Sequence, residues 1–231
     1  MIVRPETHQF ESAAGIVLDA HVFKPTAEPA ATVAFFHPGG FTMGDPTWGY
    51  RFAEAHLERS QAFVSLSYRH LTGELTIDDL LDDAEAGLDW VAGNVAGTSP
   101  VFSSGHSAGG YLAMVPVLRD ISTAIVGMSL LAPVPRIGSS LQDRLPNGAD
   151  PAQFDPAQVV STRPVPAVFV HGRLDDLVPV EGSARLDQAW RDAGCRSKLV
   201  AIEGADHFFN HPILGDQAHE QLAEAIGWLA G

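Results

Sequence analysis

The most informative segment of the chain is Val101-Phe102-Ser103-Ser104-Gly105-His106-Ser107-Ala108-Gly109. Its first four residues have the character of a buried strand, and a helical pattern starts at about Ser107. A Gly-x-Ser-x-Gly sequence at the turn from a strand to a helix is the context that a nucleophile elbow requires. The flanking glycines leave room for the turn, and the free N–H groups of the helix can face a developing oxyanion. We therefore expect Ser107 to act as a nucleophile.

Strand and helix patterns alternate on both sides of this segment. Short apolar runs predict eight strands, at His8–Glu11, Ile16–Phe23, Val33–His37, Phe63–Ser67, Val101–Ser104, Ile125–Leu131, Ala167–His171 and Lys198–Ile202. Helical patterns fall at about 47–59, at 77–91, from Ser107, at Val180–Ala193 and from about Asp216. This alternation is typical of a layered sheet with crossover helices, here as one domain over residues 1–231. The first two strands are expected to form a hairpin at one edge.

Two further segments have a predictable local structure. Thr76, with Asp79 three residues later, is expected to cap the helix that follows. The apolar face of that helix is predicted to consist of Ile77, Leu80, Leu81, Ala84, Leu88 and Val91. Residues 133–164 contain several prolines and no clear periodicity, so we expect a long connection with at most one short helix. Long connections of this kind often form a small cap or lid.

Three polar segments follow other expected strands, where open α/β sheets place their sites. They are His37-Pro38-Gly39-Gly40-Phe41, His171-Gly172-Arg173-Leu174-Asp175-Asp176 and Gly204-Ala205-Asp206-His207-Phe208. We favour His207 as the general base, because it lies in a loop after the last strand. His211 precedes a proline, which constrains its backbone, and His219 falls within the closing helix. The chemistry-bearing residues therefore occur in the chain order Ser…Asp…His.

Taken together, these segments resemble the α/β-hydrolase superfamily, in particular its small esterase and lipase-type serine hydrolases. The resemblance extends from about Val33 to His207. The segments Gly105–Ala113 and Ser65-Leu66-Ser67-Tyr68-Arg69 are similar to the hormone-sensitive-lipase-like branch. The resemblance implies an α/β-hydrolase fold, with a mostly parallel eight-stranded sheet and helices on both faces. The long N-terminal cap of many such esterases is missing here, which implies a minimal cap.

The resemblance also selects the acid of a Ser-His-Asp triad. The segment from His171 to Pro179 matches the pattern His-Gly-x-x-Asp-x-x-Val-Pro of the superfamily. In that pattern the aspartate orients the catalytic histidine, so the match points to Asp175 rather than Asp176. The expected catalytic residues are therefore Ser107, Asp175 and His207.

The segment His37–Phe41 resembles the His-Gly-Gly-Gly oxyanion loop of esterases and lipases, with Pro38 in place of the first glycine. Proline has no N–H and cannot donate a hydrogen bond. The resemblance therefore implies oxyanion donors at Gly39, Gly40 and Ala108. Among the aromatic residues near these motifs, Phe41 and Phe208 are expected to lie beside the substrate.

The composition limits the partners and the compartment. A formal net charge of -14 argues against nucleic acid or an anionic membrane as partner. A single cysteine, Cys195, rules out an intrachain disulfide and fits a reducing compartment. The first residues lack a secretory pattern, and no apolar stretch is long enough to cross a bilayer, so a cytoplasmic protein is expected. The pair His207 and His211 lacks the glutamate of a zinc motif, and no metal or other cofactor is expected.

Three hypotheses for function follow. The first is a serine hydrolase that cleaves short-acyl carboxylic esters through an acyl-enzyme, since residues 133–164 carry charges and few large apolar side chains for a lipid surface. The second is an arylformamidase or another amide-type hydrolase, which the residues do not separate from the first. The third is a non-catalytic binding protein on the same fold, against which the intact Ser-His-Asp set speaks. The expected partner is a small-molecule ester or amide, and a homodimer is left open.

Overall fold

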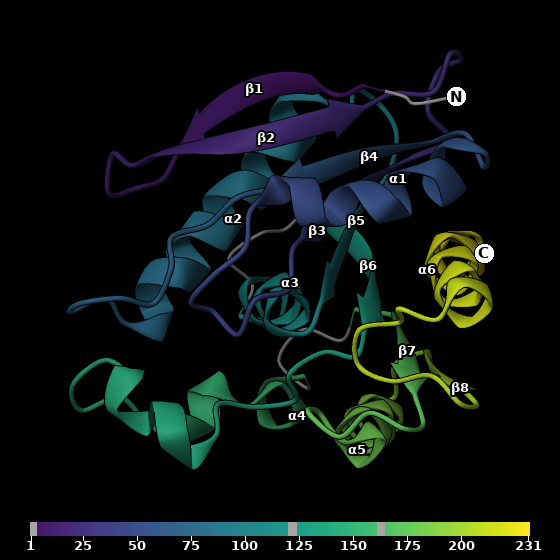
Figure 1. Ribbon diagram of the computed structural model, residues 1–231. Helices are drawn as coiled ribbons and strands as arrows, with labels where there is room; N and C mark the ends of the chain where they lie inside the picture. Colours follow the sequence, from purple (N-terminus) through teal and green to yellow (C-terminus); the bar gives the residue numbers. More distant parts are fainter. Residues whose placement is uncertain (1–3, 120–123, 161–164) are drawn as a thin grey trace.

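The alternating pattern of the sequence is realised as a sheet between two layers of helices (Figure 1). The computed structural model describes residues 4–119, 124–160 and 165–231. The sheet has eight strands in the order β1-β2-β4-β3-β5-β6-β7-β8. The strands are β1 Glu6–Glu11, β2 Val17–Phe23, β3 Ala31–Phe36, β4 Gln61–Leu66, β5 Val101–His106, β6 Ile125–Leu131, β7 Ala167–Gly172 and β8 Ser197–Ile202. Each predicted strand is present, with its ends shifted by a few residues at most.

The sheet has an antiparallel edge and a parallel body. β1 and β2 form an antiparallel hairpin at one edge, and β2 is also antiparallel to β4. All pairs from β4 to β8 are parallel. Every residue of β3, β5 and β7 is buried, as expected for parallel strands that are covered on both faces. The predicted mostly parallel sheet of the α/β-hydrolase fold is confirmed.

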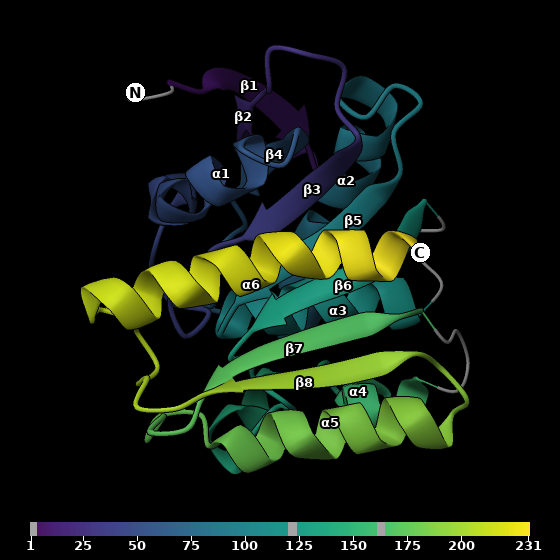
Figure 2. The same cartoon turned by 90° about the vertical axis from the view of Figure 1, so that its right-hand side faces the viewer.

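Helices cover both faces of the sheet. α1 (Tyr50–Leu57) and α6 (Pro212–Ala230) pack together on one face, which Figure 2 shows from the front. α2 (Ile77–Asn94), α3 (Ala108–Leu118) and α5 (Val180–Asp192) cover the other face. Two apolar cores result, one under each layer. The sheet is therefore packed against an apolar core on each face, and the loops at the carboxyl ends of its parallel strands start from this packed sheet.

The helix α2 agrees with the prediction in detail. The predicted apolar face is at most 2% exposed at each of its positions, Ile77, Leu80, Leu81, Ala84, Leu88 and Val91. The backbone N–H and the hydroxyl of Thr76 both donate to the carboxylate of Asp79, at 2.8 and 2.9 Å. These bonds close the first turn, where the helix dipole favours a negative charge.

The closing helix and two short segments of the connection after β6 begin at prolines, which accounts for part of the difference from the prediction. The closing helix begins at Pro212 rather than near Asp216, because proline fits the first turn of a helix, where no N–H partner is needed. The connection after β6 contains three short helical segments instead of one at most: η2 (Ser139–Arg144), η3 (Pro151–Phe154) and α4 (Pro156–Val159). The last residues of the predicted connection, 161–164, lie outside the described residues. Among the described residues, no helix is both long and apolar enough to cross a membrane.

Candidate active site

Ser107 stands at a sharp turn between β5 and α3. Its backbone has φ 56° and ψ -120°, in the region that favours glycine. The turn is possible because both neighbouring glycines lie against main chain. A Cβ on Gly105 would collide with the carbonyl of Gly109, and a Cβ on Gly109 would collide with the carbonyl of Phe36. The sequence Gly-x-Ser-x-Gly therefore presents the serine above the sheet edge at the start of a helix.

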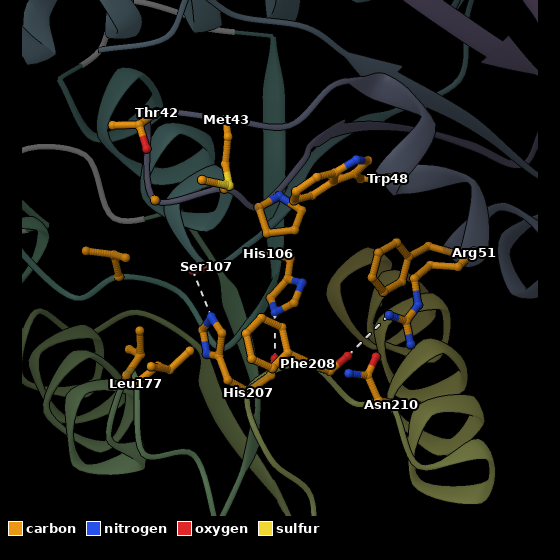
Figure 3. Close-up of a pocket in the computed structure, with 16 residues that line it drawn as sticks. Thr42, Met43, Trp48, Arg51, His106, Ser107, Leu177, His207, Phe208 and Asn210 are labelled. Atoms are coloured by element: carbon orange, nitrogen blue, oxygen red, sulfur yellow. Dashed lines mark hydrogen bonds between the residues drawn. The ribbon is translucent and has the colours of Figure 1, made fainter. Parts of the chain in front are cut away.

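The structure brings Ser107, His207 and Asp175 into one hydrogen-bonded row. Figure 3 shows its first bond, between Ser107 and His207. Nε2 of His207 lies 2.9 Å from Oγ of Ser107, and its Nδ1 lies 2.6 Å from Oδ2 of Asp175. All three residues are buried. Because Nδ1 faces a carboxylate, it carries the proton, which leaves Nε2 free to accept the proton of the serine hydroxyl. This is the arrangement of a nucleophile, a general base and an orienting acid.

The surroundings of Asp175 favour its ionised form. Its Oδ1 accepts the backbone N–H groups of Leu177 and Val178, at 3.0 and 2.8 Å. Burial alone would raise the pKa of Asp175, but hydrogen bonds from His171, His207 and the Val178 N–H hold it well below its usual range. The neighbouring Asp176 is exposed. The carboxylate that meets the histidine is therefore the one that the sequence pattern favoured.

The rival histidines lie elsewhere. His211 is exposed and stands at the N-cap of α6. His219 lies within α6, where its Nε2 accepts a hydrogen bond from Nε of Arg51 at 3.1 Å. His207 is the histidine that reaches the serine.

The glycines after β3 form one wall of the site. Gly39 and Gly40 have positive φ values of 143° and 59°, and both line the same cavity as Ser107. Within the described parts of the chain, the N–H groups of Gly39, Gly40 and Ala108 have no acceptor of their own. Ala108 is the first residue of α3, where helix N–H groups have no intrahelical partner. These three N–H groups are therefore free to bind a substrate oxygen.

The cavity beside Ser107 measures about 650 Å³. Its wall is mainly apolar, with Pro38, Met43, Trp48, Phe52, Val134, Leu177, Val178 and Phe208. Met43, Trp48, Leu177 and Phe208 are also exposed, so they form an apolar rim at the mouth. In the segment 133–160, Val134 lines the cavity, whereas η2, η3 and α4 do not. A lid formed by these turns stays a prediction.

The two predicted substrate contacts have different outcomes. Phe208 is 52% exposed and lines the cavity next to His207. Phe41 is 1% exposed, lies outside the cavity wall and packs edge-on against Tyr111, with ring centroids 5.7 Å apart. Its own backbone is left-handed, with φ 67°, and its ring belongs to the core. The ring of Phe41 therefore faces the core and not the cavity, and its contact with a substrate stays a prediction.

Two residues that the sequence did not single out hold the backbone around His207. Arg51 of α1 donates to the carbonyls of Phe208 and Phe209, at 3.2 and 2.9 Å. His106 lies 2.9 Å from the carbonyl of His207 through its Nε2, which must carry the proton (Figure 3). Burial lowers the pKa of His106 to about 3, so its ring is neutral. No local pattern marks these contacts, since they join residues at least 101 positions apart.

Comparisons with known proteins agree with this geometry. The sequence model of a family described as alpha/beta hydrolase fold matches residues 33–161. An esterase from Thermogutta terrifontis, solved with propionate bound, has a TM-score of 0.84 and 27% identity, over 100% of this chain and 96% of that one. The same esterase phosphoramylated by tabun has a TM-score of 0.85 and 25% identity, over 99% and 96% of the two chains.

A curated relative extends the comparison. A probable isoprenylcysteine alpha-carbonyl methylesterase of Oryza sativa subsp. japonica is 24% identical over 90% of this chain. The chain spans 59% of the length of that relative. The named relatives and structures are esterases, which supports the chemistry inferred from the side chains.

Proposed function

Because the chain belongs to the α/β-hydrolase family, we propose that it is a serine hydrolase that cleaves small carboxylic esters through an acyl-enzyme intermediate. The observation that carries the proposal is the row Ser107–His207–Asp175. It lies beside three backbone N–H groups that have no acceptor among the described residues. Such a row activates a hydroxyl, and such N–H groups stabilise the negative charge that the attack creates.

In the proposed cycle, Ser107 Oγ attacks the acyl carbon while His207 Nε2 takes its proton. The carbonyl electrons move onto oxygen, which the N–H groups of Gly39, Gly40 and Ala108 bind. The tetrahedral intermediate collapses, the C–O bond to the alcohol breaks, and His207 gives its proton to the leaving oxygen. Water then attacks the acyl-enzyme with His207 again as base, and the carboxylic acid leaves. Asp175 keeps the imidazole in the required tautomer throughout.

The cavity supports a substrate that is small and largely apolar. Its wall is mainly hydrocarbon, and the Arg51 guanidinium in that wall already donates to two main-chain carbonyls. The Thermogutta terrifontis esterase has been solved with propionate and with butyrate bound. We therefore place the preferred acyl groups at the short end, from acetyl to butyryl. The alcohol lies on the side of Phe208, because His207 must reach the leaving oxygen.

The test is kcat/KM across p-nitrophenyl esters from acetate to palmitate, with a formanilide in the same assay and Ser107→Ala as control. The wild type should be most active on short esters, without activation by a lipid–water interface. A maximum at long chains with interfacial activation would indicate a lipase. Higher activity on the formanilide would favour an amide-type hydrolase.

A second measurement identifies the nucleophile. An organophosphate should label Ser107 and abolish turnover, with the adduct located by peptide mass spectrometry. An adduct on another serine, with Ser107 free, would reject the assignment. A wild type that hydrolyses nothing and is not labelled would favour the non-catalytic alternative.

A further inference from the structure

A second histidine, His171, contacts the carboxylate of Asp175. His171 lies in β7, four residues before the acid, and it is fully buried. Its Nε2 is 3.1 Å from Oδ2 of Asp175, the same oxygen that meets Nδ1 of His207. Its Nδ1 is 2.7 Å from the hydroxyl of Ser183 in α5. The mechanism described above uses neither His171 nor Ser183.

The partners of His171 fix its protonation. Nε2 faces the Asp175 carboxylate and also the Val178 carbonyl, at 2.7 Å. Both groups can only accept, so the proton of the ring lies on Nε2. In the tautomer with its proton on Nε2, Nδ1 accepts the proton of the Ser183 hydroxyl. The row of hydrogen bonds therefore runs on from Ser107, His207 and Asp175 through His171 to Ser183.

We propose that His171 is a positioning residue for catalysis, which orients the Asp175 carboxylate and acts on His207 through it. The proposal rests on the proposed hydrolase function. Oδ1 of Asp175 is fixed by two backbone N–H groups, and Oδ2 is fixed by the two histidines. The Asp175 side chain is fully buried, so water cannot donate to it. Both of its oxygens therefore depend on donors from the protein.

The same histidine also links the acid loop to the sheet. Nε2 of His171 binds both the carboxylate and the carbonyl of Val178, so one N–H holds the two ends of the turn 175–178. Hydrogen bonds from both His171 and His207 hold the pKa of Asp175 below its usual range against the effect of burial. The sequence spacing His-x-x-x-Asp-x-x-Val, noted above as a match, thus has a physical basis in a shared donor.

The test compares His171→Leu, His171→Gln and Ser183→Ala, each in the wild type and in an Asp175→Asn background. The leucine variant removes the donor at similar volume, and we expect kcat to fall roughly 10- to 100-fold with KM within about 3-fold. The glutamine variant keeps an N–H near the place of Nε2 and should recover most of kcat. Ser183→Ala frees the tautomer of His171 and should cost kcat about 2- to 5-fold.

The Asp175→Asn background separates positioning from folding. If His171 acts through the carboxylate, its loss should change kcat by less than about 3-fold once Asp175 is already replaced. An equal loss in both backgrounds would overturn the proposal, as would wild-type kcat in His171→Leu. Should His171→Leu fail to fold, Ser183→Ala decides. A kcat that falls about 2- to 5-fold in the wild type but not in the Asp175→Asn background supports the role, and an equal loss in both backgrounds, or no loss in the wild type, rejects it.

The failure of this proposal differs from that of the proposed function. An active wild type whose His171 variants are unimpaired would reject the positioning role alone. A wild type without activity on any ester, and without organophosphate labelling at Ser107, would reject the hydrolase itself.

Discussion

Gly39 and Gly40 are neighbours in the loop after β3, but only one of them leaves room for a side chain. A Cβ on Gly39 would collide with the carbonyl of Met43, and its φ of 143° is barred to other residues. Around Gly40, nothing lies within 4 Å of such an atom, and φ is 59°. Alanine at position 39 must therefore distort the loop, whereas alanine at position 40 fits without a steric clash.

We predict that Gly39→Ala lowers kcat about 10²- to 10³-fold, because the loop must move and its N–H groups leave the oxyanion. Gly40→Ala should keep kcat within about 10-fold, at a cost of about 1–2 kcal/mol in folding from the left-handed backbone. The measurements are kcat on p-nitrophenyl butyrate and the free energy of unfolding in urea. Similar kcat values for the two variants would contradict the assignment of the loop.

The adjacent carboxylates Asp175 and Asp176 offer a second matched pair. Asp175→Asn puts an amide opposite Nδ1 of His207, which favours the wrong tautomer, so kcat should fall on the order of 10⁴-fold. Asp176→Asn changes an exposed side chain and should leave kcat within about 2-fold. Both variants should bind substrate with a similar KM. The opposite order of the two kcat values would show that the acid has been assigned to the wrong residue.

At the scale of elements, α1 supports the loop that carries the general base. Arg51 of α1 donates to the carbonyls of Phe208 and Phe209, and Arg59, just after α1, is paired with Glu220 of α6. Both arginines connect the same two regions of the chain, but only Arg51 contacts the His207 loop.

Arg51→Met should therefore lower kcat roughly 10- to 100-fold, since small displacements of a catalytic group are costly. Arg59→Met should leave kcat within about 2-fold. Thermal melts of both variants check that each protein is folded. If the two substitutions reduce kcat equally, the contacts of Arg51 with the loop do not position His207.

The sequence predicted the order and type of the elements because their periodicity is local. It did not place the short helical turns of the connection after β6, although two of them carry a local pattern. Asp150-Pro151 and Asp155-Pro156 each begin one, with the aspartate accepting a backbone N–H. This Asp-Pro pattern could have been found without a structure. The second and third helical segments of that connection could have been predicted in this way.

The part of the site that could be predicted from the sequence is the part formed by motifs directly after strands. Three strand-end segments contain the residues that meet in the structure, because parallel strands end at one edge of the sheet. The direction of the Phe41 ring depends on backbone angles that a sequence does not show. The contacts of Arg51 and His106 end on main-chain carbonyls, which every residue carries, so nothing in the sequence distinguishes the acceptors.

At the scale of the whole molecule, buried histidines link stability to pH. Burial lowers the pKa of His37, His56 and His219 to about 4, and that of His106 to about 3. An unfolded chain binds protons at these positions below about pH 6.5, whereas the folded chain does not. The folded state is therefore most stable above pH 6.5, and it loses stability as the pH falls toward the lowered values.

We predict that the free energy of unfolding in urea falls by several kcal/mol between pH 7 and pH 4.5, since each pKa unit corresponds to about 1.4 kcal/mol. His56→Gln should reduce this slope, because the His56 ring is buried and its Nε2 has no partner among the described residues. A free energy that is constant over this range would contradict the prediction.

The left-handed backbone of Ser107 affects which substitutions at this position would stabilise the fold. A residue with a Cβ at φ 56° costs the folded state about 1–3 kcal/mol, and glycine would relieve most of that strain. A lineage that no longer needed turnover could therefore exchange its nucleophile for glycine and become more stable. The chain keeps a serine where its own folding would prefer none. The strain at Ser107 is thus a cost in folding that only a use for the hydroxyl would offset, so glycine at this position in a relative would mark a fold that no longer needs a nucleophile.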